Sequence, residues 1–372
     1  MAVPLFDLTR QYATLRAEIE PAVCELLALG NYVLGPAVDE FENGAANFLH
    51  SAHAIGVANG TDALMLALRA INLQPGDEVI TTPFTFYSAA EVVALLGAKP
   101  VFVDIEEDTF NIDPAQIEAA ITLRTKAIIP VHLFGHPADM PAIMAIARKH
   151  DLRVIEDCAQ SWGAILDGQQ TGTWGDAGTF SFFPTKNLGS CGEGGLICSD
   201  DAKLAEKSRQ LRVHGQSQRY IYDELGYNSR LHALQATILS IKLRHVDSWN
   251  DARRKHAAHY AQLLAGTPYV VPAERDGARH IYHQYTLRLP RSLDRDRISA
   301  KLTERGIGHA IYYPRSLHLQ PVFADLGYET GDLPISERVT EEVLSLPIFP
   351  ELREDEVEAV GAALCEAVAD GG

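Results

Sequence analysis

The sequence predicts an α/β fold in which a mainly parallel, seven-stranded sheet forms a large domain and a smaller α/β domain follows it. Three observations support this. Short apolar runs alternate with amphipathic stretches of helical spacing over the first 200 residues. These runs are nearly continuous in apolar residues, which is typical of strands covered on both faces. From about residue 200 long helices dominate. We expect a large domain over 1–246 and a small domain over 247–372.

The apolar runs give the seven expected strands of the large domain. They are HAIGVAN (53–59), EVITT (78–82), VFVDI (101–105), AIIPVHLF (127–134), LRVIED (152–157), GTFSFF (178–183) and GGLICS (194–199). Most are separated by a helical stretch, and such connections join parallel strands.

Helices are predicted from apolar spacing and from capping residues. Asp113-Pro114-Ala115-Gln116 reads as a capping box with proline at the first helical position. Gly97 and Gly306 stand where helices end. The expected helices cover 61–71, 87–98, 137–150, 231–243, 247–265 and 294–305, with a last one that carries Val357, Val360, Leu364 and Val368 on one face. In the small domain strands are expected at 283–289 and 309–313.

Composition and charge exclude several classes of protein. The 372 residues carry a formal net charge of −17, which would repel a nucleic acid backbone and argues against an anionic membrane surface. The N-terminus lacks a basic segment followed by an apolar core, and no apolar run approaches the 18 or so residues of a spanning helix. The five cysteines form no CxxC pair or metal-spaced cluster. We therefore expect no metal, and mostly buried, reduced thiols in a cytoplasmic protein.

Two predicted strand ends carry polar residues suited to a ligand. Gly60 and Thr61 follow the first strand and open a helix, where free backbone N–H groups favour an anion. Alternatively, Thr61 is a simple helix cap. Asp157 ends a deeply apolar strand, three residues before Gln160, and a buried acid there calls for a cationic partner. A purely structural ion pair is the alternative.

Two further stretches carry an aromatic cluster and a lysine. Phe84, Phe86 and Tyr87 follow the strand at 78–82, where one ring could stack on a flat ligand, although core aromatics are common. In TFSFFPTKNLGSCGEGG (179–195) Lys186 lies in a turn before four closely spaced glycines. The pKa of lysine falls readily on desolvation, so this amine is a candidate nucleophile for a Schiff base. Together the four stretches match the needs of pyridoxal 5′-phosphate (PLP).

The residues resemble the DegT/DnrJ/EryC1/StrS sugar aminotransferases, which have the aspartate aminotransferase-like, type I fold of PLP-dependent transferases. The similarity covers almost the whole chain. Its motifs are YVLGP, ANGTDAL, GDEVITTPFTF, GAKPVFVDI, VIEDCAQ, SFFPTKNLG, GEGG, GYNSRL, LHLQP and SLPIFPEL. Family members that have histidine in place of the lysine carry out dehydration, so Lys186 indicates transamination.

The resemblance implies a role for each site residue. Lys186 would bind PLP and move protons during the reaction, and Asp157 would keep the pyridine nitrogen protonated. Gly60, Thr61 and Ser181 would hold the phosphate, Phe86 would stack on the ring, Gln160 would contact the ring hydroxyl, and Asn228 would reach the phosphate of the neighbouring subunit. Arg230, Tyr313 and His214 would line the sugar site. Each active site would thus be shared across a homodimer.

The implied reaction moves an amino group from L-glutamate to a keto-hexose carried on a nucleoside diphosphate. The NSRL and LHLQP motifs are similar to the branch that aminates C3 of a dTDP- or UDP-linked sugar, in preference to C4. Two alternatives stay open: transamination of a keto-cyclitol, and a catalytically idle PLP-binding protein. A nicotinamide-dependent oxidoreductase is disfavoured because no GxGxxG follows a predicted strand.

Overall fold

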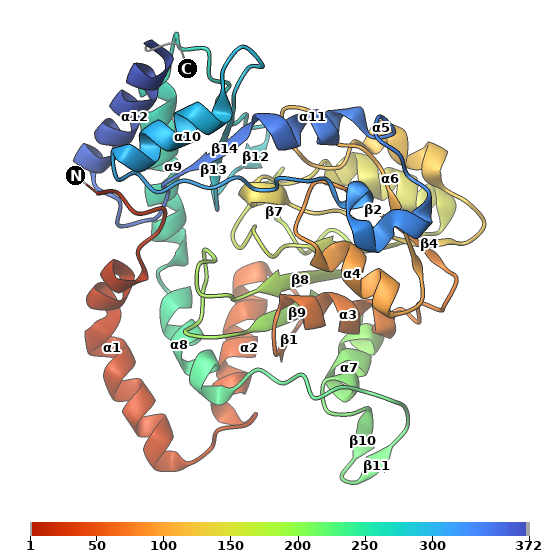
Figure 1. Ribbon diagram of the computed structural model, residues 1–372. Helices are drawn as coiled ribbons and strands as arrows, with labels where there is room; N and C mark the ends of the chain where they lie inside the picture. Colours follow the sequence, from red (N-terminus) through yellow and green to blue (C-terminus); the bar gives the residue numbers. More distant parts are fainter. Residues whose placement is uncertain (1, 370–372) are drawn as a thin grey trace.

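A seven-stranded sheet lies at the centre of the larger part of the molecule (Figure 1). The computed structural model describes residues 2–369. The sheet has the order β1-β9-β8-β5-β4-β2-β3, and β9 alone runs antiparallel to its neighbours. Its strands are β1 (His53–Val57), β2 (Glu78–Thr81), β3 (Lys99–Phe102), β4 (Thr125–Ile129), β5 (Arg153–Asp157), β8 (Ala177–Ser181) and β9 (Gly195–Ser199). All seven predicted strands are confirmed.

The helices agree broadly with their predicted ranges. They are α1 (Leu8–Leu29), α2 (Pro36–Leu49), α3 (Gly60–Ala70), α4 (Ser88–Leu95), α5 (Pro114–Ile117), α6 (Met140–His150), α7 (Ala202–Leu211), α8 (Ala233–Leu243), α9 (Val246–Leu263), α10 (Arg295–Glu304), α11 (Pro334–Glu342) and α12 (Glu354–Ala369). Short 3-10 turns are η1 (Glu118–Ala120), η2 (Leu133–Gly135), η3 (Leu317–Leu319) and η4 (Pro321–Leu326). The remaining strands are β6 (Ile165–Leu166), β7 (Gln169–Gln170), β10 (Gln216–Gln218), β11 (Ile221–Tyr222), β12 (Ala278–Arg279), β13 (Tyr285–Arg288) and β14 (Val343–Leu346).

Both faces of the sheet are buried, which explains why its strands are apolar throughout. Neighbouring residues of one strand enter different cores: Ile129 packs with α3, α4 and α7, whereas Ile128 packs with α6. Towards β1 the second face is covered instead by α2 and α8. Alternate side chains of a strand point to opposite faces, so a strand with two covered faces must be apolar at every position.

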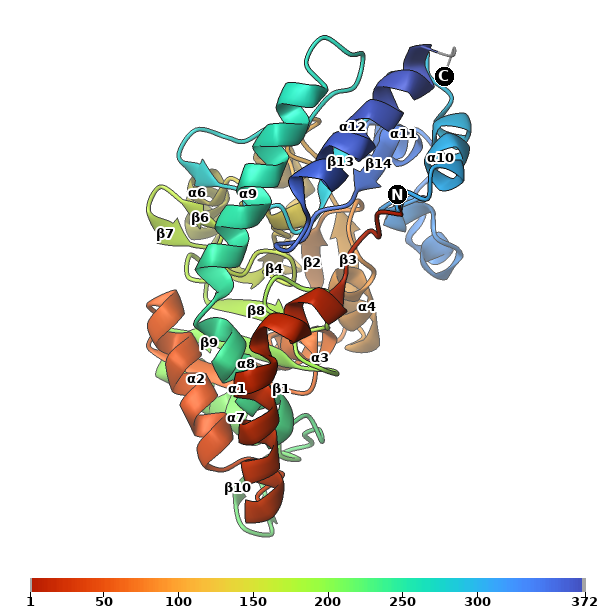
Figure 2. The ribbon, with the colours of Figure 1, turned by 90° about the vertical axis from the view of Figure 1, so that its left-hand side faces the viewer.

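A separate core holds the smaller part together. Tyr260 of α9, Leu287 of β13, Leu346 of β14 and Leu364 of α12 belong to it, and Val3 from the N-terminus joins them. Conversely, Val339 of α11, although it belongs to the C-terminal part of the chain, packs in the core of the large domain. Figure 2 shows α9 extending from α8 up into the smaller part. The boundary between 246 and 247 stays a prediction.

Two local expectations were wrong. The predicted strand at 309–313 forms only an isolated bridge, between Ala310 and Ser345, and β13 pairs with β14 instead. Only two of the five cysteines are buried, Cys158 and Cys198; two others are exposed and one is partly buried. All five are free thiols.

Candidate active site

The residues predicted to bind phosphate lie together where β1 and β8 end. Gly60 opens α3 directly after β1, and Ser181 is the last residue of β8. A Cβ added at Gly60 would lie 2.6 Å from the Cβ of Ser181, closer than real Cβ contacts allow. Only glycine therefore lets the helix approach the strand end this closely.

The N-terminus of α3 is arranged for an anion. Asn59, not Thr61, caps the helix: its side chain accepts a hydrogen bond from the N–H of Asp62 at 2.8 Å. The Thr61 hydroxyl lies 2.9 Å from that of Ser88. Within residues 2–369 the backbone N–H groups of Gly60 and Thr61 have no acceptor. Such groups, together with the helix dipole, attract negative charge.

Asp157 and Lys186 lie at the adjoining strand ends and influence each other's charge. Asp157 is buried at the end of β5, and its Oδ1 accepts a hydrogen bond from the N–H of Ala159 at 3.0 Å. Burial raises the pKa of this carboxyl, against the opposing effects of that N–H, of Lys186 and of His132. Burial lowers the pKa of Lys186 to about 8, and the attraction of Asp157 opposes the shift. At neutral pH roughly a tenth of the amine is therefore neutral, a far larger share than for a lysine with its usual pKa, and the neutral form is the nucleophile.

Gln160 and Tyr313 link the large domain to the C-terminal part beside Asp157. The side chain of Gln160 accepts from the N–H of Phe134 at 2.7 Å and donates to the Tyr313 hydroxyl at 3.0 Å. Phe84 is fully buried in the core. The Phe86 side chain, by contrast, is 58% exposed, so its ring face is open to a ligand.

Asn228, Arg230 and His214 form a separate group. They lie on the segment between α7 and α8, which carries the projecting β10–β11 hairpin (Figure 1). The Asn228 side chain accepts a hydrogen bond from Arg230, and Asn228 bridges Val213. His214 is exposed. Within residues 2–369 no hydrogen bond or ion pair joins the three to Lys186 or Asp157, although Ser229, between Asn228 and Arg230, accepts from the N–H of Ala58 at 3.3 Å, near Gly60.

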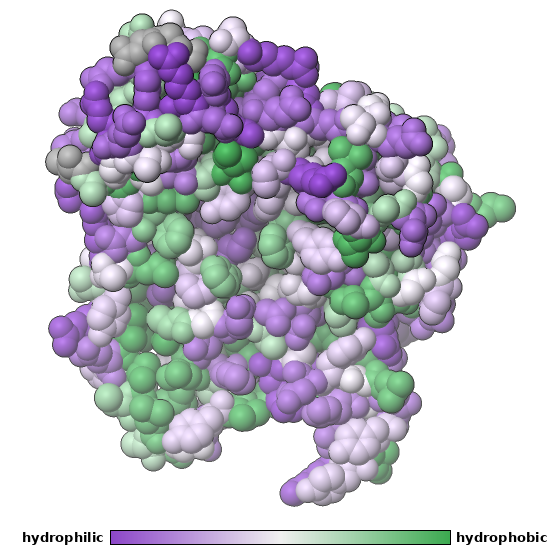
Figure 3. All heavy atoms as spheres, viewed as in Figure 1, coloured by the Kyte–Doolittle hydropathy of each residue, from purple (hydrophilic) through white to green (hydrophobic). Residues whose placement is uncertain are grey.

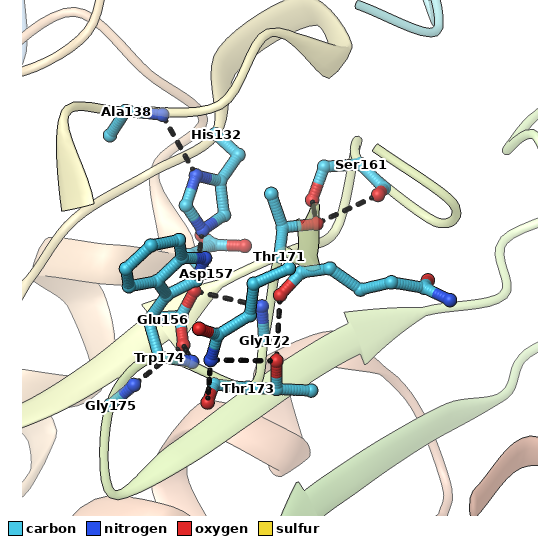
Figure 4. A network of polar contacts seen from close by, with 12 residues as sticks. His132, Ala138, Glu156, Asp157, Ser161, Thr171, Gly172, Thr173, Trp174 and Gly175 are labelled. Carbon is cyan, nitrogen blue, oxygen red and sulfur yellow. Dashed lines mark hydrogen bonds and ion pairs between the residues drawn. The ribbon is translucent and has the colours of Figure 1, made fainter. Parts of the chain in front are cut away.

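A buried network beneath Asp157 was not predicted (Figure 4). Glu156, fully buried, accepts hydrogen bonds from the backbone N–H groups of Gly172, Trp174 and Gly175 at 2.7–2.8 Å and approaches Nε2 of His132 at 2.9 Å. Since Nδ1 of His132 accepts from the N–H of Ala138, Nε2 carries the proton. The two acids of VIEDCAQ thus have different partners. Glu156, the acid next to the predicted site residue Asp157, was the sequence signal for this network.

A second unpredicted group surrounds Asn187, the residue after Lys186. The amide of Asn187 donates to Oδ1 of Asn250 at 2.7 Å and to the carbonyl of Ile281 at 3.3 Å. Its Oδ1 lies 3.0 Å from Nδ1 of His283. These contacts join the turn that carries Lys186 to α9 and to the segment between β12 and β13.

The chain is similar to known proteins over almost its whole length. It is 52% identical to a pleiotropic regulatory protein of Geobacillus stearothermophilus, over 98% of both chains. It is 48% identical to a UDP-N-acetyl-3-dehydro-α-D-glucosamine 3-aminotransferase of Acidithiobacillus ferrooxidans, over 98% of this chain and 97% of the relative.

Solved structures agree with these relatives. DesV of S. venezuelae, in complex with a ketimine intermediate, matches with a TM-score of 0.95 at 42% identity over 98% of both chains. NtdA of Bacillus subtilis, with bound cofactor PMP, matches with a TM-score of 0.93 at 33% identity over 99% of this chain and 85% of that one. The family model of the DegT/DnrJ/EryC1/StrS aminotransferases matches residues 13–365. The chain therefore belongs to the DegT/DnrJ/EryC1/StrS aminotransferase family, and it is a PLP-dependent aminotransferase.

Proposed function

We propose that the chain moves an amino group from L-glutamate to C3 of a keto-hexose linked to UDP or dTDP, in amino-sugar and polysaccharide biosynthesis. The observation that carries the proposal is the desolvated amine of Lys186, in the turn after β8, whose charge interacts with that of the buried Asp157 at the end of the neighbouring strand β5. The Acidithiobacillus relative, named as a 3-aminotransferase of a UDP-linked sugar, supports the sugar and its position.

The residues at the sheet edge fit PLP. When bound, PLP accepts the electrons that a breaking C–H bond leaves behind. The N–H groups of Gly60 and Thr61, with the Ser181 hydroxyl, would bind its phosphate, and the close approach of Gly60 to Ser181 leaves the helix end open for it. The exposed ring of Phe86 would stack on it.

The remaining residues would hold or move protons, or contact the ring hydroxyl and the sugar substrate. Asp157 would hold a proton on the pyridine nitrogen; the N–H of Ala159, which donates to its Oδ1, favours the carboxylate against the effect of burial. Gln160 would contact the ring hydroxyl. Lys186 would take the α-proton from the amino donor and return it to the cofactor, for which a pKa of about 8 is well placed. Tyr313 would contact the sugar substrate.

We further propose a homodimer in which Asn228 and Arg230 complete the partner's site, with His214 close by. Large exposed apolar side chains support it, at the C-terminal end of α1 and on the β10–β11 hairpin. They include Leu27, Leu29, Tyr32, Val33, Tyr220, Ile221, Tyr222 and Leu225. In Figure 3 apolar atoms gather at the lower left, where α1 and α8 lie. Exposed apolar patches of this kind mark association surfaces.

Two observations bear on the membrane and on the cellular compartment. Between residues 2 and 369 no helix has both the length and the apolar character needed to cross a membrane. The five free thiols suit the reducing cytoplasm, where we place the reaction.

The proposal is tested by the visible spectrum of the PLP-loaded protein before and after addition of L-glutamate. We expect the absorbance of the lysine-bound cofactor to bleach while 2-oxoglutarate is released, and Lys186→Ala to lack that absorbance from the start. UDP- and dTDP-linked 3-keto and 4-keto hexoses then follow, and amination of the 3-keto sugars should be fastest. Turnover confined to 4-keto sugars would contradict the C3 assignment.

One relative favours a second candidate function. The Geobacillus protein is named as a pleiotropic regulatory protein. The second candidate is therefore a regulator, and we propose that such a chain would bind PLP without turning it over. The same spectrum separates the two: a PLP-loaded protein whose absorbance ignores glutamate, and every other amino acid offered, would support the regulator.

A further inference from the structure

Arg253, on α9, is a buried cation that forms no ion pair within 4.0 Å among residues 2–369; the carboxylate of Glu351 acts on it only from farther away. Its side chain is 5% exposed. Nη1 makes all of its hydrogen bonds, to the carbonyls of Ile348 at 2.7 Å, Tyr282 at 3.3 Å and His283 at 3.4 Å. Nε is buried without an acceptor. Among residues 2–369 no carboxylate lies within 4.0 Å of the guanidinium.

The guanidinium is charged nonetheless. Burial lowers the pKa of Arg253 to about 10, so it remains a cation at neutral pH. Placing a charge in the interior without a counter-ion is costly, and folded proteins normally provide a partner. A missing partner is therefore a sign that a ligand provides it.

A cavity of about 50 Å³ lies against this side chain. Arg253, Thr185, His283, Gln284, Tyr312 and Ser345 supply its polar lining. Thr185 directly precedes Lys186, and Tyr312 directly precedes Tyr313, the partner of Gln160. His283 of the lining also lies close enough to Lys186 for the charge of that amine to lower its pKa, so the cavity lies near the candidate active site.

His283 does not compensate the charge. Asn187 spends its amide N–H groups on Asn250 and Ile281, so its Oδ1 accepts and Nδ1 of His283 donates. Burial, then Lys186 and Arg253, push the pKa of His283 well below its usual range, so the ring is neutral. Arg253 is the one charged group of the lining.

We propose that this Arg253 pocket binds a carboxylate of the amino donor, an α-amino acid. Guanidinium and carboxylate match each other as a planar, two-pronged pair. A cavity of about 50 Å³ admits a carboxylate but is too small for a nucleoside diphosphate. Its position near Lys186 suits a donor whose α-carbon must lie within reach of that amine. The inference rests on the proposed function, since it names where that reaction holds its donor.

The test measures the two half-reactions separately in the PLP-loaded protein, with three variants. Arg253→Lys keeps the charge but loses the two-pronged geometry. Gln284→Glu has almost the same shape and places a competing carboxylate in the pocket. The control is Arg254→Lys, at the next position of α9, where the arginine pairs with Glu274 outside the cavity.

We expect at least about a tenfold rise in the concentration of L-glutamate needed for half-maximal rate in both pocket variants. Amination of the cofactor by the amino-sugar nucleotide, the reverse of the second half-reaction, should stay within about twofold, and the control should match wild type in both. Equal losses in both half-reactions, or none in the glutamate half-reaction, would overturn the assignment. Should Arg253→Lys fail to fold, Gln284→Glu decides alone.

A binding measurement keeps this inference separate from the proposed function. Glutarate, an unreactive dicarboxylate, should raise the melting temperature of the wild-type holoprotein and of Arg254→Lys, and raise that of Gln284→Glu less. This result supports the pocket even if glutamate proves not to be a substrate, in which case only the proposed function fails. An equal shift in Gln284→Glu, or an equally Gln284-dependent shift with inorganic phosphate, would contradict a carboxylate pocket.

Discussion

The amine of Lys186 lowers the stability of the protein as long as no cofactor occupies it. Burial lowers its pKa from 10.5 to about 8, so at pH 7.5 the folded chain carries a desolvated ammonium. Between pH 8 and 10.5 the unfolded state binds more protons than the folded state, and stability rises with pH through this window. The reactive group is therefore most costly at neutral pH.

Lys186→Met tests this cost. Without cofactor, the variant should exceed wild type in free energy of unfolding by about 2–3 kcal/mol at pH 7.5, and the gain should shrink towards pH 10.5. Urea unfolding of both proteins at several pH values measures it. Lys203→Met, at an exposed position of α7, should differ from wild type by less than about 0.5 kcal/mol at every pH. A gain at Lys186 that does not depend on pH would point to better packing instead of the lost charge.

Individual site residues were predictable where the sequence placed a signal beside them. Gly60 and Asp157 directly follow or end apolar runs, and Lys186 precedes a cluster of glycines. Arg253 carries no such signal, because it lies among other charged residues of a helical stretch. Only the packing of α9 against the segments at 282–283 and 348 makes it a buried cation.

At the scale of elements, the loop from Thr171 to Gly175 is held by one carboxylate. Glu156 is an acceptor for three backbone N–H groups of this loop and for the imidazole of His132. Each of its two oxygens is engaged, and β5 delivers Asp157 from the adjacent position. The network therefore fixes the strand end from which the site acid projects.

Glu156→Gln should destabilise the protein by about 2–4 kcal/mol, because an amide nitrogen cannot accept the N–H groups that now point at an oxygen. Chemical denaturation measures the loss. Glu118→Gln is the matched control, since this acid forms its ion pairs with Lys149 and His150 at the surface, and it should cost less than about 1 kcal/mol. Equal losses in the two variants would show that the buried network has no special weight.

The elements of the large domain were predictable because burial on both faces leaves a continuous apolar pattern. The small domain gave a weaker signal. HAIYY at 309–313 has the composition of a strand, yet Tyr313 reaches Gln160 across the domain junction and the segment forms only one bridge to β14. A tertiary contact, invisible in the local sequence, decided its conformation.

At the scale of the whole molecule, the predicted site residues form two clusters that share no hydrogen bond or ion pair within residues 2–369. Lys186 and Asp157 occupy the sheet edge, whereas Asn228 and Arg230 lie on the projecting segment between α7 and α8. A closed twofold dimer presents the same surface of each subunit to the other, so it can bring the second cluster of one chain to the first cluster of its partner.

Mixing two inactive variants tests this arrangement. In a heterodimer of Asn228→Ala and Lys186→Ala subunits, one site would combine an intact Lys186 with an intact Asn228, while the other would have neither. Random exchange at equal amounts makes half of the dimers mixed, so about a quarter of wild-type activity should return. Native mass spectrometry confirms the exchange. If mixed dimers form and activity stays at the level of the separate variants, each site belongs to a single chain and Asn228 acts within its own subunit.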